Sequence, residues 1–363
     1  MLKINIEKQI GQLQLKINTN LPMQGVTAVF GRSGAGKTSL VNIIGGLSTP
    51  DNGEIRLGDK LLYQQGKVNL PPEKRHIGYV FQEARLFPHY KVRGNLNYGV
   101  RQKNPPLFTK IVHLLGIEHL LERYPITLSG GEKQRVAIGR ALLTSPDMLL
   151  MDEPLASLDL PRKQELLPYL QALTRELKLP IVYVSHSLDE ILQLADHMLV
   201  LNQGQVIAQG PLTDVWNSEQ MRPWIPLQDL SSLICADIAD RHPNYPMTRL
   251  IMADGNHLWI SGYLDKPEYK QQLKVRIQAN HVSVCTQPPI GSSIRNLLKG
   301  EIRELYKSES GEQIQLKIAL GTDELWANVT PWACDELKLV QGKTIYAQIK
   351  GVTMTQMDIA QSH

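Results

Sequence analysis

The sequence predicts an α/β domain with a largely parallel sheet, followed by a smaller all-β region. From residue 26 to about residue 210, apolar segments with the length of buried strands alternate with helical segments, which is the pattern of a parallel sheet. A glycine-rich turn lies between the first of these strands and its helix. Beyond residue 235, short strands are separated by closely spaced turn residues, which is typical of one or two small β-barrels.

Composition limits the class of protein. The 363 residues suffice for two or three domains, and 42% hydrophobic with 20% charged residues is ordinary for a globular protein. A net charge of +4 is too small to indicate nucleic-acid binding. Cys235, Cys285 and Cys334 lack metal-ligand spacing, so we expect reduced cytoplasmic thiols. The N-terminus lacks a signal-peptide pattern, and no apolar run approaches the roughly 18 residues that cross a bilayer, so we expect membrane contact only through a partner.

Each element of the α/β domain follows from local patterning. Strands are expected in a hairpin within residues 1–25 that turns at Gly11, at 26–30, twice within 53–63, and at 77–82, 148–151, 181–185 and 197–201. Helices are expected to begin at residue 39 and to span about 132–143 and 188–195, and a further helix is expected to carry Pro161 in its first turn. Pro168 lies inside that last pattern and is predicted to kink the helix or shift its start.

Two regions depart from the alternation of strand and helix. Residues 84–127 combine a proline-broken aromatic stretch with one apolar helical face, which predicts a small inserted helical subdomain. After about residue 210 the helical periodicity fades, and we expect a linker at 211–235. The strands expected beyond the linker lie at residues 258–262, 273–279, 314–318, 325–329 and 344–350.

The turn after residues 26–30 is a phosphate-binding loop by its residues and its context between strand and helix. The loop consists of Gly31, Arg32, Ser33, Gly34, Ala35, Gly36, Lys37 and Thr38. Its glycines allow backbone N–H groups to point into one concavity, and the helix N-terminus adds a positive dipole end. Lys37 is expected to reach the outer phosphates of a nucleotide, and the Thr38 hydroxyl is expected to ligate Mg²⁺.

A second anion-binding helix start is predicted at Leu128-Ser129-Gly130-Gly131-Glu132-Lys133-Gln134-Arg135. Ser129 is a good N-cap, and Gly130 and Gly131 allow the first amides of the helix to approach an anion closely. One nucleotide does not need two such sites from one chain, but the second has a use if it faces a nucleotide held by another copy. A plain capped helix is the alternative for Ser-Gly-Gly alone.

Polar side chains follow three of the predicted strands. Asp152 and Glu153 end the strand at 148–151, where Asp152 can hold Mg²⁺ and Glu153 can act as general base toward water. His186 follows the strand at 181–185 and is placed to bond a γ-phosphate. Gln82 ends the strand at 77–82 and offers an oxygen to Mg²⁺ or water. Adjacent carboxylates are also common where a strand enters an ordinary solvated loop. The presence of the phosphate-binding loop in the same domain is the reason to favour the metal-binding and catalytic roles.

Together these motifs resemble those of the ATP-binding-cassette (ABC) ATPases, in family order across residues 1–210. The resemblance implies that residues 31–38 are the P-loop, that 128–135 are the signature motif and that Asp159 ends the D-loop. It also implies that Gln82 is the Q-loop glutamine, Asp152 the magnesium aspartate, Glu153 the catalytic glutamate and His186 the switch histidine. It implies ATP and Mg²⁺ as ligands. It also implies a head-to-tail homodimer, in which Ser129 and Gly131 of one copy contact ATP on the P-loop of the other.

Two features qualify the resemblance. Cassettes usually carry an adenine-stacking aromatic residue on the early strand, and residues 12–20 contain none, so no adenine contact is assigned. Residues 87–96 are rich in aromatic side chains and, in the importer branch of the family, this region meets a membrane permease. The same cluster can instead be the core of the helical subdomain.

The C-terminal region resembles the OB-like accessory β domains of bacterial importer ATPases, and residues 290–363 resemble the small molybdate-binding (Mop or TOBE type) β-barrel, after an accessory β segment at 236–289. The whole chain, including Pro-His-Tyr-Lys-Val-Arg-Gly-Asn-Leu at 88–96 and Ser-Leu-Asp-Leu-Pro-Arg-Lys at 157–163, is similar to ATP-binding subunits of molybdate importers. Ser293, Arg295 and Lys350 can supply the hydroxyl and positive charges that a tetrahedral oxyanion such as molybdate requires. Alternatively they are solvated surface residues.

This resemblance implies a peripheral ATPase at the cytoplasmic face of the bacterial inner membrane, which works as a homodimer on a permease and indirectly with a periplasmic or extracellular substrate-binding protein. No nucleic-acid partner is expected. Two alternatives stay open at this stage. One is an importer of sulfate, iron or a polyamine with the same machinery, and the other is a cassette ATPase of repair or translation without a transport role.

Overall fold

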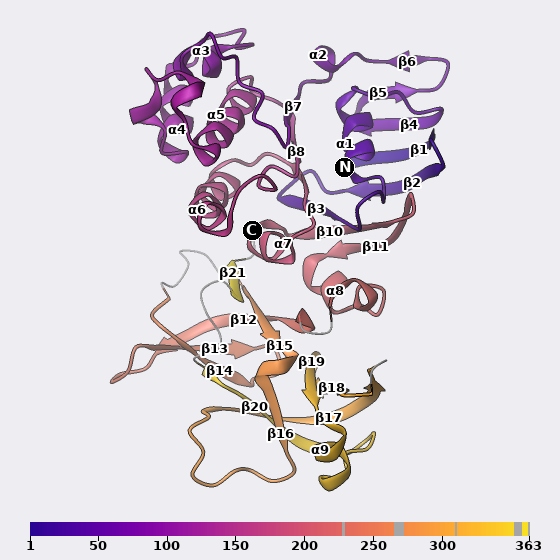
Figure 1. The fold of residues 1–363 in the computed structure, drawn as a ribbon, viewed down its shortest axis with the longest axis vertical. Helices are drawn as coiled ribbons and strands as arrows, with labels where there is room; N and C mark the ends of the chain where they lie inside the picture. The colour runs from indigo at the N-terminus through magenta and orange to yellow at the C-terminus, as the bar shows by residue number, and fades with distance from the viewer. Residues whose placement is uncertain (227–228, 265–271, 309–310, 352–357, 362–363) are drawn as a thin grey trace. The chain divides into compact units, whose positions relative to one another are not determined.

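The computed structural model describes residues 1–226, 229–264, 272–308, 311–351 and 358–361 (Figure 1). The chain divides into two compact units, Met1–Leu212 (unit 1) and Thr213–Ser362 (unit 2). Among the described residues, no helix combines the length and the apolar character that a membrane span requires.

Unit 1 is built on one 11-stranded sheet in the order β6-β5-β4-β1-β2-β11-β10-β3-β9-β8-β7. Its strands are β1 (Leu2–Ile10), β2 (Leu13–Leu21), β3 (Val26–Phe30), β4 (Asn52–Leu57), β5 (Lys60–Gln64), β6 (Val68–Asn69), β7 (Ile77–Val80), β8 (Met148–Asp152), β9 (Ile181–Val184), β10 (His197–Asn202) and β11 (Gln205–Pro211). The neighbours from β10 to β7 pair in parallel, as predicted. The predicted hairpin of residues 1–25 is confirmed and lies in the same sheet, where β1 pairs with β4 antiparallel and β2 pairs with β11 in parallel.

The helices of unit 1 are α1 (Lys37–Gly45), α2 (Pro72–Arg75), α3 (Val92–Asn97), α4 (Pro105–Leu114), α5 (Gly130–Leu142), α6 (Leu160–Glu176) and α7 (Leu188–Leu194), with 3₁₀ turns η1 (Glu118–Leu120) and η2 (Pro125–Thr127). Helices α3, α4 and α5 pack together, apart from the antiparallel strands (Figure 1). All five residues of β3 and of β8 are buried, as expected for strands of a parallel sheet covered on both faces. The phosphate-binding loop follows β3, and the acidic pair Asp152 and Glu153 lies at the end of β8.

Helix α6 decides one of the two outcomes expected of Pro168, the shift of the helix start. It begins at Leu160, where Asp159 is the N-cap, and it continues through Pro168 to Glu176. The start of the helix is therefore not shifted by the proline. Four apolar side chains explain why the helix persists, because their burial compensates for the missing N–H: Leu166, Leu167, Leu170 and Leu173.

Unit 2 contains two five-stranded sheets, β14-β13-β12-β15-β21 and β16-β20-β17-β18-β19. Its elements are α8 (Leu212–Asn217), η3 (Arg222–Trp224), β12 (Ser231–Arg241), β13 (Met247–Met252), β14 (His257–Ser261), β15 (Leu273–Gln278), η5 (Ala279–His281), β16 (Val282–Cys285), β17 (Asn296–Lys307), β18 (Ile314–Leu320), β19 (Asp323–Val329), α9 (Pro331–Glu336), β20 (Thr344–Ile349) and β21 (Ile359–Gln361). One hydrophobic cluster contains residues of both sheets.

Residues 211–235, for which we expected a linker, are largely folded. They contain α8, η3 and the start of β12. Leu212, Val215 and Trp216 are buried at the spacing of one helical turn, a pattern too short to stand out as periodicity. Each sheet of unit 2 also takes strands from both sides of residue 290, because β21 joins the first sheet and β16 the second.

Candidate functional site

The phosphate-binding loop connects β3 to α1 with a backbone that requires glycine. Gly31 has φ +154°, and a Cβ there would lie 2.3 Å from the carbonyl oxygen of Leu201. Gly36 is the N-cap of α1 in the left-handed conformation, with φ +101°. These two glycines allow the loop to turn tightly against β10 and to open α1 with its first amides unobstructed.

Lys37 is the first residue of α1, and its side chain folds back over its own loop. Its Nζ donates to the carbonyl oxygens of Gly31 at 2.8 Å and Arg32 at 3.2 Å, and lies 4.0 Å from Glu153 Oε1. Burial lowers the pKa of Lys37, and the carboxylates of Glu153 and Asp152 oppose that shift. The ammonium group therefore lies at the loop that would hold an anion.

Asp152, the last residue of β8, is buried next to Thr38. The Thr38 hydroxyl donates to Asp152 Oδ1 at 3.1 Å, and the hydroxyl of Tyr79 on β7 lies 3.5 Å from Oδ2 while it donates to Asn42 Oδ1 at 2.8 Å. Burial raises the pKa of Asp152, and the hydrogen bond from Thr38 opposes the shift. A hydroxyl and a carboxylate side by side are oxygen ligands that Mg²⁺ prefers, so these residues fit that ion.

Glu153 lies between two other predicted residues. Its Oε2 is 3.4 Å from Nδ1 of His186, and its Oε1 faces Lys37. Its φ of +46° is uncommon for a residue other than glycine, and its N–H donates to the carbonyl oxygen of Val184 at the end of β9. The bend turns the carboxylate toward the loop after β9, which carries His186. Lys37, Glu153 and His186 thus meet at the carboxyl ends of neighbouring parallel strands.

The predicted signature motif forms the start of α5. Ser129 and Glu132 form a reciprocal capping box, in which the Glu132 N–H donates to Ser129 Oγ and the Ser129 N–H donates to Glu132 Oε2. Gly130 and Gly131 occupy the first turn of α5 and are half-buried. Residues 152, 153 and 186 lie on other elements. Among the described residues, the hydrogen bonds of Ser129 run to Glu132 and not to any of these three.

Gln82 follows β7, which ends at Val80, so the predicted strand at 77–82 is two residues too long. Its side chain is exposed. Helix α5 holds the adjacent backbone, because Gln134 Nε2 donates to the Phe81 oxygen at 3.2 Å and Arg140 donates to the oxygens of Ala84 and Arg85.

Asp159, the predicted end of the D-loop, is the N-cap of α6. Its Oδ1 accepts a hydrogen bond from the Arg162 N–H at 3.2 Å, and its side chain is otherwise exposed. The Asp159 carboxylate therefore stabilises the start of α6 as its N-cap.

Sequence reasoning missed three supporting residues. Tyr79 and Asn42 border Asp152, and Glu190 is buried behind the His186 loop. Tyr79 stands within a short apolar strand pattern, where nothing distinguishes it from a core residue. Glu190 follows the exposed Asp189 in the first turn of α7, so nothing in the local sequence distinguishes it as a buried carboxylate.

The three residues predicted for an oxyanion lie in unit 2. Arg295 and Lys350 flank the paired residues Asn296 and Ile349, so they occur at the same end of the neighbouring strands β17 and β20. Ser293 precedes Arg295 by two residues, and all three side chains are exposed. The structure thus brings the two cations to one sheet end but does not bury them.

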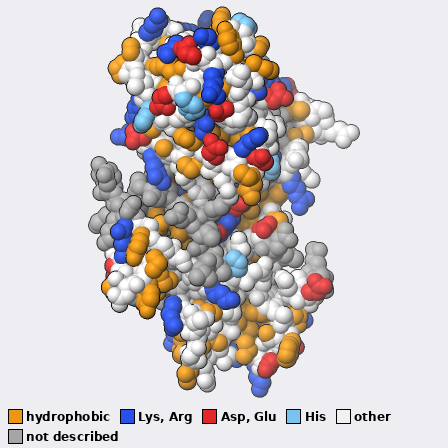
Figure 2. Space-filling view, turned by 60° about the vertical axis from the view of Figure 1, so that its left-hand side comes forward, with side chains coloured by type: hydrophobic (Ala, Val, Ile, Leu, Met, Phe, Trp, Pro, Cys, Tyr) orange, Lys and Arg blue, Asp and Glu red, His pale blue; other side chains and the backbone are white. Residues whose placement is uncertain are grey.

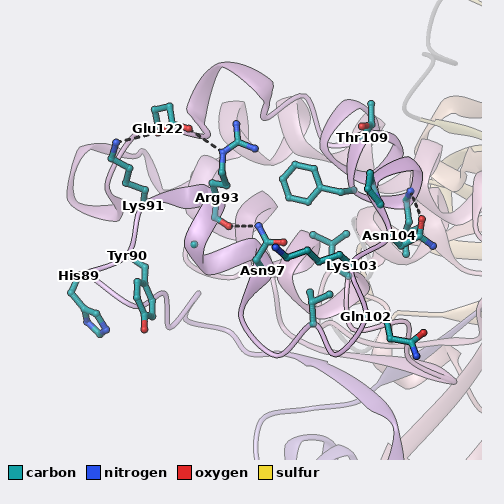
Figure 3. A pocket seen from close by; sticks show the side chains of 16 residues that line it. His89, Tyr90, Lys91, Arg93, Asn97, Gln102, Lys103, Asn104, Thr109 and Glu122 are labelled. Carbon is teal, nitrogen blue, oxygen red and sulfur yellow. Dashed lines mark hydrogen bonds and ion pairs between the residues drawn. The ribbon is translucent and has the colours of Figure 1, made fainter.

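The helical group of unit 1 contains a cavity of about 690 Å³ (Figure 3). Lys91 and Arg93 on its wall both form ion pairs with Glu122, of 3.1 and 3.0 Å.

The aromatic stretch at residues 87–96 is partly internal and partly exposed, because Phe87 packs on Tyr98 while 51% of Tyr98 is exposed. On the face drawn in Figure 2, acidic and basic side chains are interspersed over unit 1.

Comparison with known proteins gives the class. Residues 15–156 match the family model of ABC transporters, and residues 292–355 match that of the TOBE domain. A dimeric post-hydrolysis structure of the ATP-binding cassette MJ0796 bound to ADP and Pi is 25% identical with a TM-score of 0.51, and covers 59% of this chain and 100% of its own. The structure of cbiO1 from Clostridium perfringens is 29% identical with a TM-score of 0.53, over 61% of this chain and 92% of its own. Fold and site define an ABC ATPase with a C-terminal TOBE domain, which confirms the predicted fold class.

The whole chain also has curated relatives. "Molybdenum import ATP-binding protein ModC" of Shewanella sp. (strain MR-7) is 80% identical over 100% of both chains. Proteins of the same name from Photobacterium profundum and Salmonella choleraesuis are 55% and 52% identical, over 99% and 98% of this chain and 100% of their own. The chain belongs to the ModC family of molybdenum import ATP-binding proteins.

Proposed function

We propose that this chain is the ATP-hydrolysing subunit of an importer for molybdate. The observation that carries the hydrolytic part is the carboxylate of Glu153 between Lys37, at 4.0 Å, and His186, at 3.4 Å. An acceptor for a proton from water therefore lies beside a phosphate-binding cation. The molybdate part rests on the names of relatives that match the chain from end to end.

In this proposal the loop 31–38 holds the phosphates of ATP through its backbone amides and Lys37. Thr38, Asp152 and Gln82 would hold Mg²⁺, which would supply positive charge to neutralise the phosphates. Glu153 accepts a proton from the attacking water, and His186 orients Glu153 and bonds the γ-phosphate. The protein thus contributes positioning and electrostatic stabilisation, the two terms that dominate phosphoryl transfer.

A second copy completes the pocket. Ser129, Gly130 and Gly131 supply amides to ATP bound by the other protomer, and Asp159 lies at the same junction. The capping box preorganises these amides for an anion. The homodimer works at the cytoplasmic face of the bacterial inner membrane on an integral-membrane permease, which receives its substrate from a periplasmic or extracellular binding protein. ATP closure switches the permease, and hydrolysis resets it.

Uptake in the bacterium that encodes the chain tests this function. Cells in which Glu153→Gln or Lys37→Ala replaces the natural chain should lose uptake of labelled molybdate, and the purified variants should lose ATPase activity. Uptake of labelled sulfate, iron and polyamine serves as the control and should be unchanged. Loss of one of these in place of molybdate assigns that substrate instead, and normal ATPase activity of Glu153→Gln contradicts the mechanism.

We also propose that Ser293, Arg295 and Lys350 bind the oxyanion. Titration calorimetry of the full-length protein with molybdate should give a binding heat that Arg295→Ala reduces. Arg303→Ala is the matched control, because Arg303 is an exposed arginine of β17 whose described ion pair is with Glu301. Equal affinities of the two variants would leave residue 295 outside the binding site.

A further inference from the structure

Glu190 on α7 is a buried carboxylate at the centre of a polar cluster. It is 4% exposed and accepts three hydrogen bonds from side chains. Its Oε2 accepts from the Ser185 hydroxyl at 2.6 Å and the Tyr183 hydroxyl at 2.9 Å, and its Oε1 accepts from Lys163 Nζ at 2.9 Å. A buried carboxylate is costly unless it is paired and hydrogen-bonded, and these three donors meet that requirement.

The cluster includes Ser185 and contacts Ser187, the residues immediately before and after His186. Ser185 Oγ, which donates to Glu190, also accepts from the Ser187 N–H at 3.0 Å. Ser187 is the N-cap of α7 and accepts from the Glu190 N–H at 3.4 Å. Both neighbours of His186 are therefore fixed by one buried carboxylate and its own backbone, while the imidazole is exposed and contacts Glu153.

The third donor connects this turn to another element. Lys163 lies in the first turn of α6, one turn after its N-cap Asp159. Its ion pair with Glu190 is largely buried, with side-chain exposures of 19% and 5%. Solvent therefore screens this ion pair less than it screens a surface pair. The position of the His186 loop is thereby tied to the start of α6.

We propose that Glu190 is a positioning residue for ATP hydrolysis. It fixes the backbone on both sides of His186 and so sets the distance between His186 Nδ1 and Glu153, and through Lys163 it ties that distance to α6. This inference rests on the proposed hydrolytic role of Glu153 and His186. A neutral amide at position 190 keeps the shape but weakens the pair with Lys163 and brings its own N–H donors toward groups that now donate to it.

Histidine NMR tests the positioning without requiring activity. The protein contains ten histidines, and the ring signal of His186 is assigned by its loss in His186→Ala. In folded Glu190→Gln we expect the His186 signal to shift while the other histidine signals stay in place. If Glu190→Gln does not fold, Lys163→Met, which removes one of the three donors, should give the same selective shift. An unmoved His186 signal in the folded variant overturns the proposal.

Kinetics then separates positioning from stability. Glu190→Gln should lower kcat by roughly 10- to 100-fold, as expected for a misplaced catalytic group, with KM for ATP within about twofold. Lys110→Met is the matched control for Lys163→Met, because Lys110 pairs with Glu176 at an exposed site, and its kcat should equal that of the wild type. A Glu190→Gln kcat equal to that of the wild type would overturn the proposal. A wild-type protein without ATPase activity would contradict the proposed function but leave the NMR result as the test of positioning.

Discussion

At the scale of single residues, Asp152 combines a predicted metal-binding role with an unfavourable environment. Burial raises its pKa in the folded chain, so the folded state binds a proton more tightly than the unfolded state does. Stability therefore falls as pH rises from the ordinary carboxyl pKa of 3.8 through the raised pKa of the folded state. Above both values the whole cost of the buried charge is present.

The variant Asp152→Asn should accordingly have a higher midpoint of thermal unfolding than the wild type at pH 7 without ligands. The difference should shrink as pH is lowered through the raised pKa and vanish below 3.8, where the wild-type carboxyl is neutral in both states. Asp159→Asn is the control, because asparagine is an equally good N-cap and residue 159 is exposed. A midpoint of Asp152→Asn that is lower than that of the wild type at pH 7 would contradict this account.

Gly131 allows a test of the proposed contact between α5 and a nucleotide on the second copy. Apart from the backbone of its own helix and its chain neighbours, a Cβ at Gly131 would have no atom of the described residues within 4 Å, whereas a Cβ at Gly130 would lie 3.0 Å from Leu158 Cδ2. Gly131→Ala should therefore fold with unchanged or slightly higher stability, by up to about 1 kcal/mol, because alanine favours a helix. Its ATPase rate should fall at least about tenfold, because the methyl group obstructs the close approach of an anion to the helix start. Full activity of Gly131→Ala would remove this glycine from the nucleotide site.

At the scale of elements, α1 depends on a residue far from it in sequence. Arg75 is fully buried, and its Nη1 donates at 2.8 Å to the oxygens of both Ile43 and Ile44 at the end of α1. Its Nε donates to the Leu70 oxygen at 2.8 Å. Burial lowers the pKa of Arg75, and the negative end of the helix dipole favours its charge. The helix that begins with Lys37 is therefore fixed at its far end by this guanidinium.

Arg75→Met should lower the free energy of unfolding by roughly 3 kcal/mol, because buried carbonyl groups lose their donors. Arg56→Met is the matched control, since Arg56 lies on β4 at the surface and pairs with Glu54, and it should lose less than about 1 kcal/mol. Urea denaturation measures both. Equal losses would show that the Arg75 hydrogen bonds add nothing beyond a surface pair.

Elements with a local signal were predictable, and those that depend on distant contacts were not. The P-loop, the strand that ends at Asp152 and the capped start of α5 each carry their signal within a short stretch of chain. Arg75, Tyr79 and Glu190 act through partners from other elements, so no local pattern marks them. Sequence placed Glu153 and His186 at strand ends, but their 3.4 Å contact required the sheet order β3-β9-β8.

At the scale of the whole molecule, the order of strands in unit 2 could not be predicted. Five of its strands were expected, β14, β15, β18, β19 and β20, whereas β12, β13, β16, β17 and β21 were not. Moreover, β12 pairs with β15 and β17 pairs with β20, across long stretches of chain. Alternating strands do not specify their partners, because the same pattern fits many pairings. The shared core of unit 2 is therefore evident only in the structure, where both sheets contribute to one hydrophobic cluster.

The two units provide separate signals for ligand binding. All five tryptophans lie in unit 2: Trp216, Trp224, Trp259, Trp326 and Trp332. In Glu153→Gln, which is expected not to hydrolyse ATP, MgATP at about 100 times its Kd should stabilise unit 1 by about 2.7 kcal/mol. Circular dichroism should then show a higher unfolding midpoint for part of the signal, while the midpoint of tryptophan fluorescence stays in place. A parallel rise of both midpoints would show that the two units unfold together.

The central claim is that one chain holds the nucleotide and a second copy supplies part of the anion-binding amides. The most direct test is the initial rate of phosphate release by the purified wild-type protein, measured over a wide range of protein concentration. We expect the rate per chain to rise with concentration until dimers saturate, and Lys37→Ala to show no release at any concentration. A rate per chain that stays constant down to concentrations at which the protein is monomeric would contradict the claim.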